Sequence, residues 1–161
     1  MSTSNNPIDK LSLTNPIHFL ALGFGSGLAP KAPGTFGTIA ALPVIYLASL
    51  LPANGYLIAT IVAAIIGIYI CGKAASDMGE HDHGAIVWDE IAGYMVAMLW
   101  LPLTWQNLLA AFVLFRIFDI IKPWPISLLD KHVHGGFGIM IDDIIAGIFA
   151  LLCLHGYYFY W

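Results

Sequence analysis

The chain has 161 residues, of which 59% are hydrophobic and only 10% charged, and its formal net charge is −4 at pH 7. Soluble domains carry about 25% charged residues, so a chain this short cannot bury all of its apolar side chains. We therefore expect a single membrane-embedded domain over residues 1–161, with residues 1–14 as a flexible tail. The small net charge argues against a nucleic-acid partner, and the N-terminus lacks the basic region and cleavage site of a signal peptide.

Apolar runs follow one another along the chain and predict an all-α membrane bundle. The first, residues 17–28, is too short to cross a membrane and predicts an interfacial or re-entrant segment. Longer runs predict about five short spans, at 36–51, 56–72, 91–103, 105–121 and 139–160. Four spans plus one re-entrant early run is the alternative. Crossing the bilayer core takes about 20 apolar residues, so some spans should be tilted or thin the membrane.

The lysines indicate how these runs are oriented. The connections at 52–55 and 101–107 carry no charge, whereas the opposite loops hold Lys31, Lys73, Lys122 and Lys131. The positive-inside rule makes the lysine-bearing loops cytoplasmic, and the aromatic end YYFYW should lie at the far interface. All ten acids fall in or near the cytoplasmic loops. Cys71 and Cys153 lie in apolar runs, and we interpret both as buried small hydrophobic residues.

An internal repeat contains two pairs of acids. HDHGAIVWDEIAG (81–93) is echoed by HVHGGFGIMIDDIIAG (132–147), and each copy predicts a helix that begins at its acid pair. The pairs are Asp89 with Glu90 and Asp142 with Asp143. Helix capping explains about one acid per helix, because acids stabilise the positive end of the helix dipole. Capping remains an alternative for these residues.

A metal site explains the acid pairs more fully. Asp89 shares a helix face with Gly93 and Ala97, and Asp143 shares one with Gly147. Small residues allow two helices to approach closely, so the carboxylates should face a neighbouring helix. Converging carboxylates repel each other unless a cation lies between them, and hard oxygen ligands suit Mg²⁺.

Two cations follow in the stretch FRIFDIIKPWP (115–125). Arg116 and Asp119 are three residues apart on one helical face, so they could form an internal ion pair. Alternatively, Asp119 joins the acids while Arg116 binds a phosphate, which arginine suits well. Lys122 ends the run before Pro123 and could contact lipid headgroups or the same phosphate.

The loops contain further candidates. His81, His83, His132 and His134 could transfer protons near neutral pH, although ordinary loop hydrogen bonds are an equal alternative. The loop GFGSGLAPKAPGTFGT (23–38) carries Lys31, a predicted turn at Pro33-Gly34, and Thr35 as a cap of the next helix. Such a helix start could hold an anion, with a plain re-entrant turn as the alternative.

The motifs together resemble the bacterial phosphatidylglycerophosphatase A family. The segments GFGSGLAPKAPGTFGT, DMGEHDHGAIVWDEIAG, FRIFDIIKPWPI and HVHGGFGIMIDDIIAG follow the family pattern in order, from about residue 15 to 150. The resemblance implies a Mg²⁺-dependent phosphatase of the bacterial inner membrane. It would hydrolyse phosphatidylglycerophosphate to phosphatidylglycerol and phosphate, late in anionic phospholipid synthesis.

On this interpretation each candidate residue has a role. Asp89, Glu90, Asp142 and Asp143 would bind the metal; Lys31, Thr35, Arg116 and Lys122 would bind the substrate. The candidate catalytic residues are Asp82, His83, Asp119 and His134. The signatures of phosphatases with a covalent Cys or His are absent, as is the Asp-x-Asp-x-Thr/Val motif, so we expect attack by water; a nucleophilic Asp is the alternative.

Other classes of function fit less well. An ion or proton transport subunit would need a path of polar groups across the membrane, and a CDP-alcohol phosphotransferase would need a longer Asp-rich motif. The expected partners are the lipid substrate and the bilayer, and a homo-oligomer is compatible with the sequence.

Overall fold

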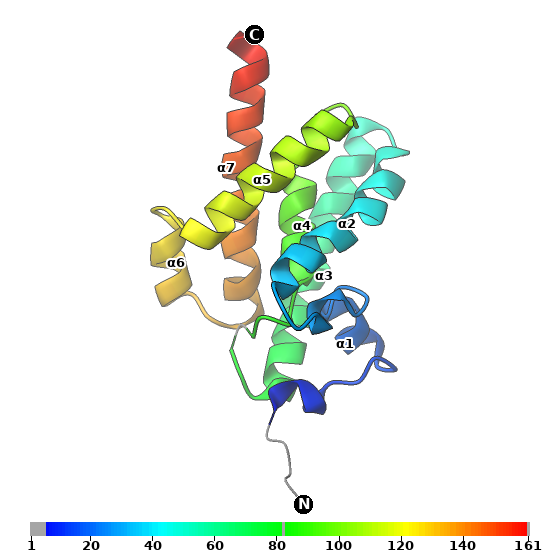
Figure 1. Ribbon diagram of the computed structural model, residues 1–161, viewed down its shortest axis with the longest axis vertical. Coiled ribbons are helices and arrows are strands. Elements are labelled where there is room, and N and C mark those ends of the chain that lie inside the picture. The colour runs from blue at the N-terminus through cyan, green and yellow to red at the C-terminus, as the bar shows by residue number, and fades with distance from the viewer. Residues whose placement is uncertain (1–5, 82, 161) are drawn as a thin grey trace, which may run out of the picture.

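The computed structural model describes residues 6–81 and 83–160, and the regular secondary structure in this part of the chain consists of helices joined by loops, without strands (Figure 1). The predicted all-α class is confirmed. In chain order the elements are η1 (Pro7–Lys10), α1 (Pro16–Ala21), η2 (Ser26–Leu28), α2 (Pro33–Ser49), α3 (Ala53–Met78), α4 (Trp88–Ala97), α5 (Trp105–Ile121), α6 (Ile126–His132) and α7 (Gly135–Tyr160).

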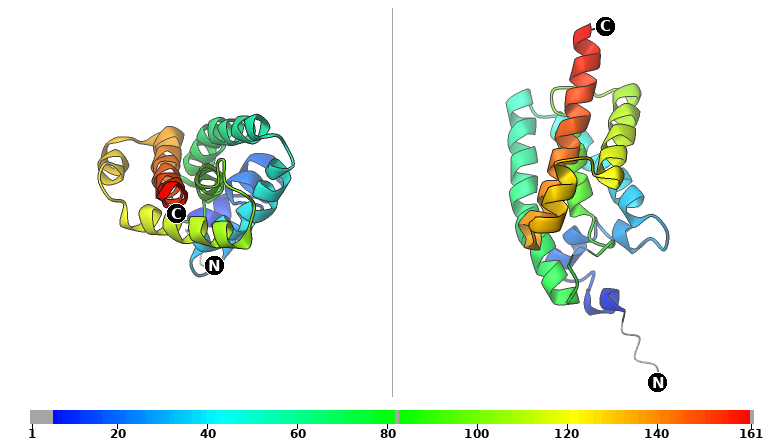
Figure 2. Two further views of the ribbon diagram at one scale, coloured as in Figure 1. Left: turned by 90° about the horizontal axis from the view of Figure 1, so that it is seen from above. Right: turned by 90° about the vertical axis from the view of Figure 1, so that its left-hand side faces the viewer.

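Helix α4 lies at the centre of the bundle and packs against α2, α3, α5 and α7 (Figure 2). Every residue from Ile91 to Ala97 is buried. The sequence predicts a membrane span at 91–103, and this prediction is wrong because α4 has only 10 residues. Such a helix is about 15 Å long, half of the bilayer core of about 30 Å. Its apolar side chains face other helices instead of lipid.

Two helices have the length and composition of a membrane span. Helices α3 and α7 have 26 residues each, and both are strongly apolar. Helices α2 and α5 are shorter, at 17 residues each. The described chain therefore has two membrane-capable helices where the sequence predicts about five spans. The short segment predicted at 17–28 forms α1 and η2.

Helix α7 begins earlier than the sequence predicts. The predicted start at Asp142 is wrong, because α7 begins at Gly135 and places both acids in its interior. Close packing on α3 explains the extension: a Cβ on Gly136 would lie 1.8 Å from the Ile68 carbonyl oxygen. This contact outweighs the low helix propensity of glycine. Capping therefore cannot explain the second acid pair, since the effect of the dipole is confined to the first turn.

The start of α2 also differs from the prediction. Helix α2 begins at Pro33, and Ala32 is its N-cap, in the left-handed region with φ of 49°. Gly34 is therefore helical, so the predicted turn at Pro33-Gly34 is wrong, as is the predicted cap at Thr35. Proline favours the first helical position because its φ is already fixed near the helical value.

Two smaller expectations can also be compared with the structure. Cys71 is buried as predicted, but Cys153 is exposed on α7, so that prediction is wrong. Within the predicted tail, residues 7–10 form η1, and the Lys10 ammonium donates to the Met78 carbonyl at 3.3 Å.

Candidate metal and phosphate site

The site is built where α4 crosses α7. A Cβ on Gly93 would lie 2.7 Å from the Asp143 carbonyl oxygen, and a Cβ on Gly147 would lie 2.3 Å from the Gly93 carbonyl oxygen. Only glycine allows this approach. The predicted small-residue face, with Asp89 and Gly93 on one helix and Asp143 and Gly147 on the other, is therefore confirmed.

Three carboxylates meet beside this crossing. One oxygen each of Asp89, Glu90 and Asp143 can be chosen so that all lie within 4.8 Å of one another. Asp89 is 4% exposed and Asp143 is 3% exposed. Glu90 Oε2 and Asp143 Oδ2 are buried and have no hydrogen-bond partner among the described residues.

This set of donors fits a hard divalent cation. Buried carboxylates at such distances repel one another strongly, because the surroundings screen charge poorly. Mg²⁺ takes oxygen ligands and is usually held by one or two carboxylates together with waters and substrate phosphate. The two unpartnered oxygens provide ligand atoms that no other described group uses.

Arg116 lies between two of the acids. Its guanidinium forms an ion pair with Asp119 on the same helix, and its Nη1 lies 3.8 Å from Glu90 Oε1. The predicted ion pair is thus present, and Arg116 also lies beside the three-carboxylate group. Its Nε is buried without a hydrogen-bond partner among the described residues, so one donor is available for another acceptor.

The first turn of α2 closes over the same region. A Cβ on Gly34 would lie 3.0 Å from Arg116 Nη1 and 3.1 Å from Glu90 Oε1. Gly34 therefore brings the positive end of a 17-residue helix next to the candidate site. Sequence analysis missed this role. The only sequence signal for this role is that Gly34 occupies the second position of a helix that begins with a proline.

Lys122 and Asp142 lie together at the edge of the site. Lys122 Nζ is 3.9 Å from Asp142 Oδ2 and 3.9 Å from Asp130 Oδ1. Burial lowers the pKa of the Lys122 ammonium, but the nearby carboxylates, Asp143 foremost, raise it by more and the net shift is upward. Lys122 is therefore positively charged at neutral pH, and Asp142 faces it outside the three-carboxylate group.

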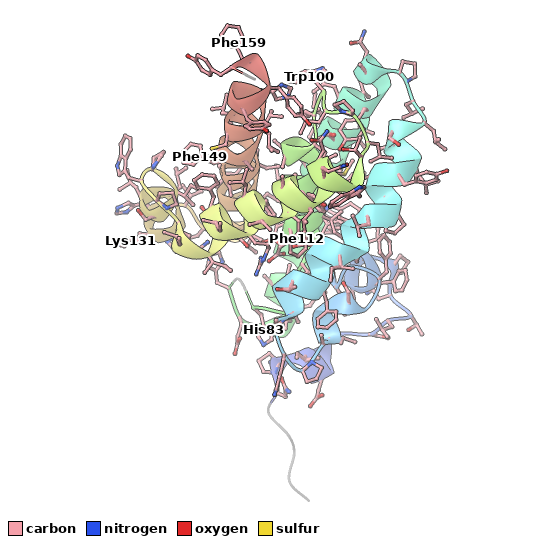
Figure 3. The ribbon with its side chains drawn as sticks, turned by 45° about the horizontal axis from the view of Figure 1, so that its top comes forward. His83, Trp100, Phe112, Lys131, Phe149 and Phe159 are labelled. Carbon is pink, nitrogen blue, oxygen red and sulfur yellow. The ribbon has the colours of Figure 1, made fainter. Side chains whose placement is uncertain are left out.

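The loop candidates are more dispersed. His83 is half-buried in the loop between α3 and α4 (Figure 3), where its Nδ1 accepts a hydrogen bond from the Ala85 amide at 3.0 Å. The exposed His134 lies against His81, with ring centroids 5.3 Å apart, so the two copies of the repeat meet here. Lys31 is exposed and Thr35 is half-buried in the first turn of α2. Asp82 lies outside the described residues.

Comparisons with known proteins identify the family of the chain. The profile of the family described as Phosphatidylglycerophosphatase A matches residues 19–158. The chain belongs to this family. Phosphatidylglycerophosphatase A of Haemophilus influenzae is 52% identical over 152 residues, which cover 93% of both chains. Phosphatidylglycerophosphatase A of Escherichia coli is 51% identical over 142 residues, covering 88% of this chain and 83% of the relative.

A more distant relative has a different name. A protein of Bacteroides thetaiotaomicron, provisionally named as a phosphatidylinositol-3-phosphatase, is 36% identical over 143 residues, covering 84% of this chain and 89% of the relative. No solved structure matches the chain significantly. The phosphatidylglycerophosphatase A match includes all the described acids of the candidate site, since it extends from residue 19 to 158.

Proposed function

We propose that the chain hydrolyses the terminal phosphate monoester of phosphatidylglycerophosphate and releases phosphatidylglycerol and phosphate. Family membership supports this reaction, because two relatives that are 52% and 51% identical carry the corresponding name. The observation that carries the proposal is the convergence of Asp89, Glu90 and Asp143 beside Arg116. This arrangement combines ligands for a metal with a cation suited to phosphate.

Asp89, Glu90 and Asp143 are the proposed Mg²⁺ ligands. Bound there, Mg²⁺ would neutralise phosphate charge and lower the pKa of a bound water. Asp142 was a further ligand candidate from the sequence, but it faces Lys122 at 3.9 Å. Its proposed role is to position that ammonium.

The cationic side chains bind and orient the phosphate. Arg116 is held by Asp119 on one side and lies 3.8 Å from Glu90 on the other, so its planar guanidinium has a fixed direction. A fixed guanidinium matches phosphate oxygens in a bidentate manner. Lys122 adds a second positive charge at the rim. Lys31 and Thr35, at the start of α2, are proposed to contact the rest of the headgroup.

Proton transfer completes the reaction. Attack by water must release one proton, and the departing glycerol oxygen must gain one. His83 precedes α4 by a short loop and is the first candidate for this transfer, with Asp82, Asp119 and His134 as the others. None of the signatures for a covalent Cys or His route occurs in the sequence.

We place this reaction at the cytoplasmic face of a bacterial inner membrane, with the chain crossing it more than once. Helices α3 and α7 have the required length and hydropathy. Four residues along α3 support contact with lipid, since each large side chain is at least 48% exposed: Ile58, Ile61, Ile65 and Tyr69. The acyl chains could then stay in the leaflet while the phosphate reaches the site.

The sequence of α7 does not support the transport alternative. Beyond Asp143, residues 144–154 of α7 are entirely apolar. An ion or proton would need polar groups in this region to cross the membrane. The carboxylates therefore form a site at one end of the bundle, as an enzyme of lipid headgroups requires.

Phosphate release by the purified protein in detergent tests the proposed function. We expect Mg²⁺-dependent release from phosphatidylglycerophosphate and its abolition by a chelator. Phosphatidylinositol-3-phosphate serves as a second substrate, because a relative carries that name. Faster hydrolysis of the phosphoinositide would overturn the proposed substrate, and metal-independent release would overturn the proposed metal site.

A further inference from the structure

An apolar groove lies between α2 and α5. Its volume is about 310 Å³, and it is lined by Leu42, Tyr94, Trp105, Leu108, Leu109 and Phe112. Helix α4 lies between α2 and α5 (Figure 1) and contributes Tyr94 to the floor of the groove. Because the Tyr94 hydroxyl donates to the Leu108 carbonyl at 2.6 Å, its polar atom is satisfied and the lining is effectively apolar.

The groove and the site share both walls. On α2, Leu42 follows Gly34 by two helical turns, about 12 Å along the axis. On α5, Phe112 precedes Arg116 by one turn and Leu108 precedes it by two, about 6 Å and 12 Å away. Gly34 and Arg116 lie beside Glu90 at this end of the two helices. The apolar groove therefore lies about one helical turn from the phosphate site, since Phe112 and Tyr94 are each four residues from Arg116 and Glu90.

This proximity identifies the occupant. A phospholipid substrate carries apolar chains, and a glycerol and a phosphodiester separate them from its terminal phosphate. A chain-binding surface must therefore lie some distance from the metal ligands and on the lipid-facing side of them. We propose that the groove between α2 and α5 holds one acyl chain of the lipid substrate, an assignment that rests on the proposed phosphatase function.

The groove should contribute orientation more than affinity. An acyl chain leaving the bilayer for this groove exchanges one apolar environment for another, so burial provides little driving force. Held between α2 and α5, however, the chain fixes the direction from which the headgroup enters the site. Misplacement of a reacting group by about 1 Å can lower a rate by as much as about 100-fold.

The test compares two substrates on the full chain in detergent. One is dioleoyl phosphatidylglycerophosphate and the other its dibutanoyl analogue, whose chains are too short to extend along the groove. Leu42→Trp fills the groove from α2. We expect it to lower the ratio of kcat/KM for the long-chain over the short-chain substrate by about tenfold. Leu47→Trp is the matched control, because Leu47 lies on the same helix, is 64% exposed and is outside the groove.

Leu42→Trp could fail to fold, which a lost helical circular dichroism signal or a changed elution volume would reveal. A second pair of variants is used in that case. Leu109→Trp fills the groove from α5, and Val113→Trp, one turn away and 45% exposed, is its control. An unchanged ratio in a folded groove variant would overturn the assignment, and so would an equal loss on both substrates. Failure of the wild-type chain to hydrolyse either substrate would instead overturn the proposed function.

Discussion

Gly147 of α7 packs directly on Gly93 of α4, where a Cβ on Gly147 would come within 2.3 Å of the Gly93 carbonyl oxygen. Asp89 and Asp143 each lie one turn before these glycines on their own helices. The glycine contact therefore sets the separation of the two carboxylates, which lie within a 4.8 Å group with Glu90.

Gly147→Ala should force the two helices apart. Overpacking of this kind costs about 1–3 kcal/mol of stability, and the carboxylates would separate as the helices move. We expect a lower unfolding temperature and at least tenfold weaker Mg²⁺-dependent activity. Gly156→Ala on the same helix is the control, since its Cβ would meet no atom within 4 Å. Full activity in Gly147→Ala would show that the crossing does not define the site.

The two adjacent acids of α7 should respond differently to amide substitution. Asp143→Asn removes a proposed metal ligand, and we expect apparent Mg²⁺ affinity to fall by more than about 100-fold. Asp142→Asn alters a residue that faces Lys122 at 3.9 Å, and we expect a loss of about tenfold. The apparent Mg²⁺ affinity of each variant is measured from its activity as a function of free Mg²⁺. A larger loss of Mg²⁺ affinity in Asp142→Asn than in Asp143→Asn would show that Asp142 is the ligand and would contradict the proposed role of Asp143.

Arg116 and Asp119 allow the ion-pair and phosphate-binding roles to be separated. Asp119→Leu removes the same-helix partner of Arg116 and leaves Glu90 at 3.8 Å, so it should destabilise the fold by less than the about 3–5 kcal/mol lost when a fully buried pair is broken. The double variant Arg116→Met with Asp119→Leu removes both charges and should recover much of that stability. We expect its activity to stay at least about 100-fold below wild type, because a phosphate-binding cation and a candidate proton-transfer group are both gone. If the double variant recovered both stability and activity, Arg116 would have only a structural role.

Gly34→Ala tests the contact of α2 with the site. The added methyl would lie 3.0 Å from Arg116 Nη1 and 3.1 Å from Glu90 Oε1, so the guanidinium or the carboxylate must shift by a few tenths of an ångström. Alanine is also the better helix former, by about 1 kcal/mol. We therefore expect near-normal thermal stability with activity reduced about tenfold. Equal activity in Gly34→Ala and Gly156→Ala would contradict the proposed contact.

The local features of this site could be predicted from the sequence. Asp89 and Gly93 share a helix face because they are four residues apart, and the same holds for Asp143 and Gly147. Spacing alone predicted that small residues would bring these acids to a neighbouring helix, and the structure confirms it.

Features that depend on distant packing could not be predicted. An apolar run at 91–103 looks the same whether it faces lipid or other helices, so the buried helix α4 was mistaken for a span. Helix α7 extends through Gly136 only because α3 approaches it closely. Likewise, the role of Gly34 depends on Arg116, which is far away in the sequence.

The Mg²⁺ dependence of phosphate release from phosphatidylglycerophosphate is the most direct test of the three-carboxylate site. Wild-type protein, Asp89→Asn and Leu47→Trp would be titrated with free Mg²⁺ in detergent after a chelator has removed bound metal. We expect saturable activation of the wild type and of Leu47→Trp, and at least 100-fold weaker activation of Asp89→Asn. Release that persists in chelator, or an Asp89→Asn titration that matches wild type, would contradict this account.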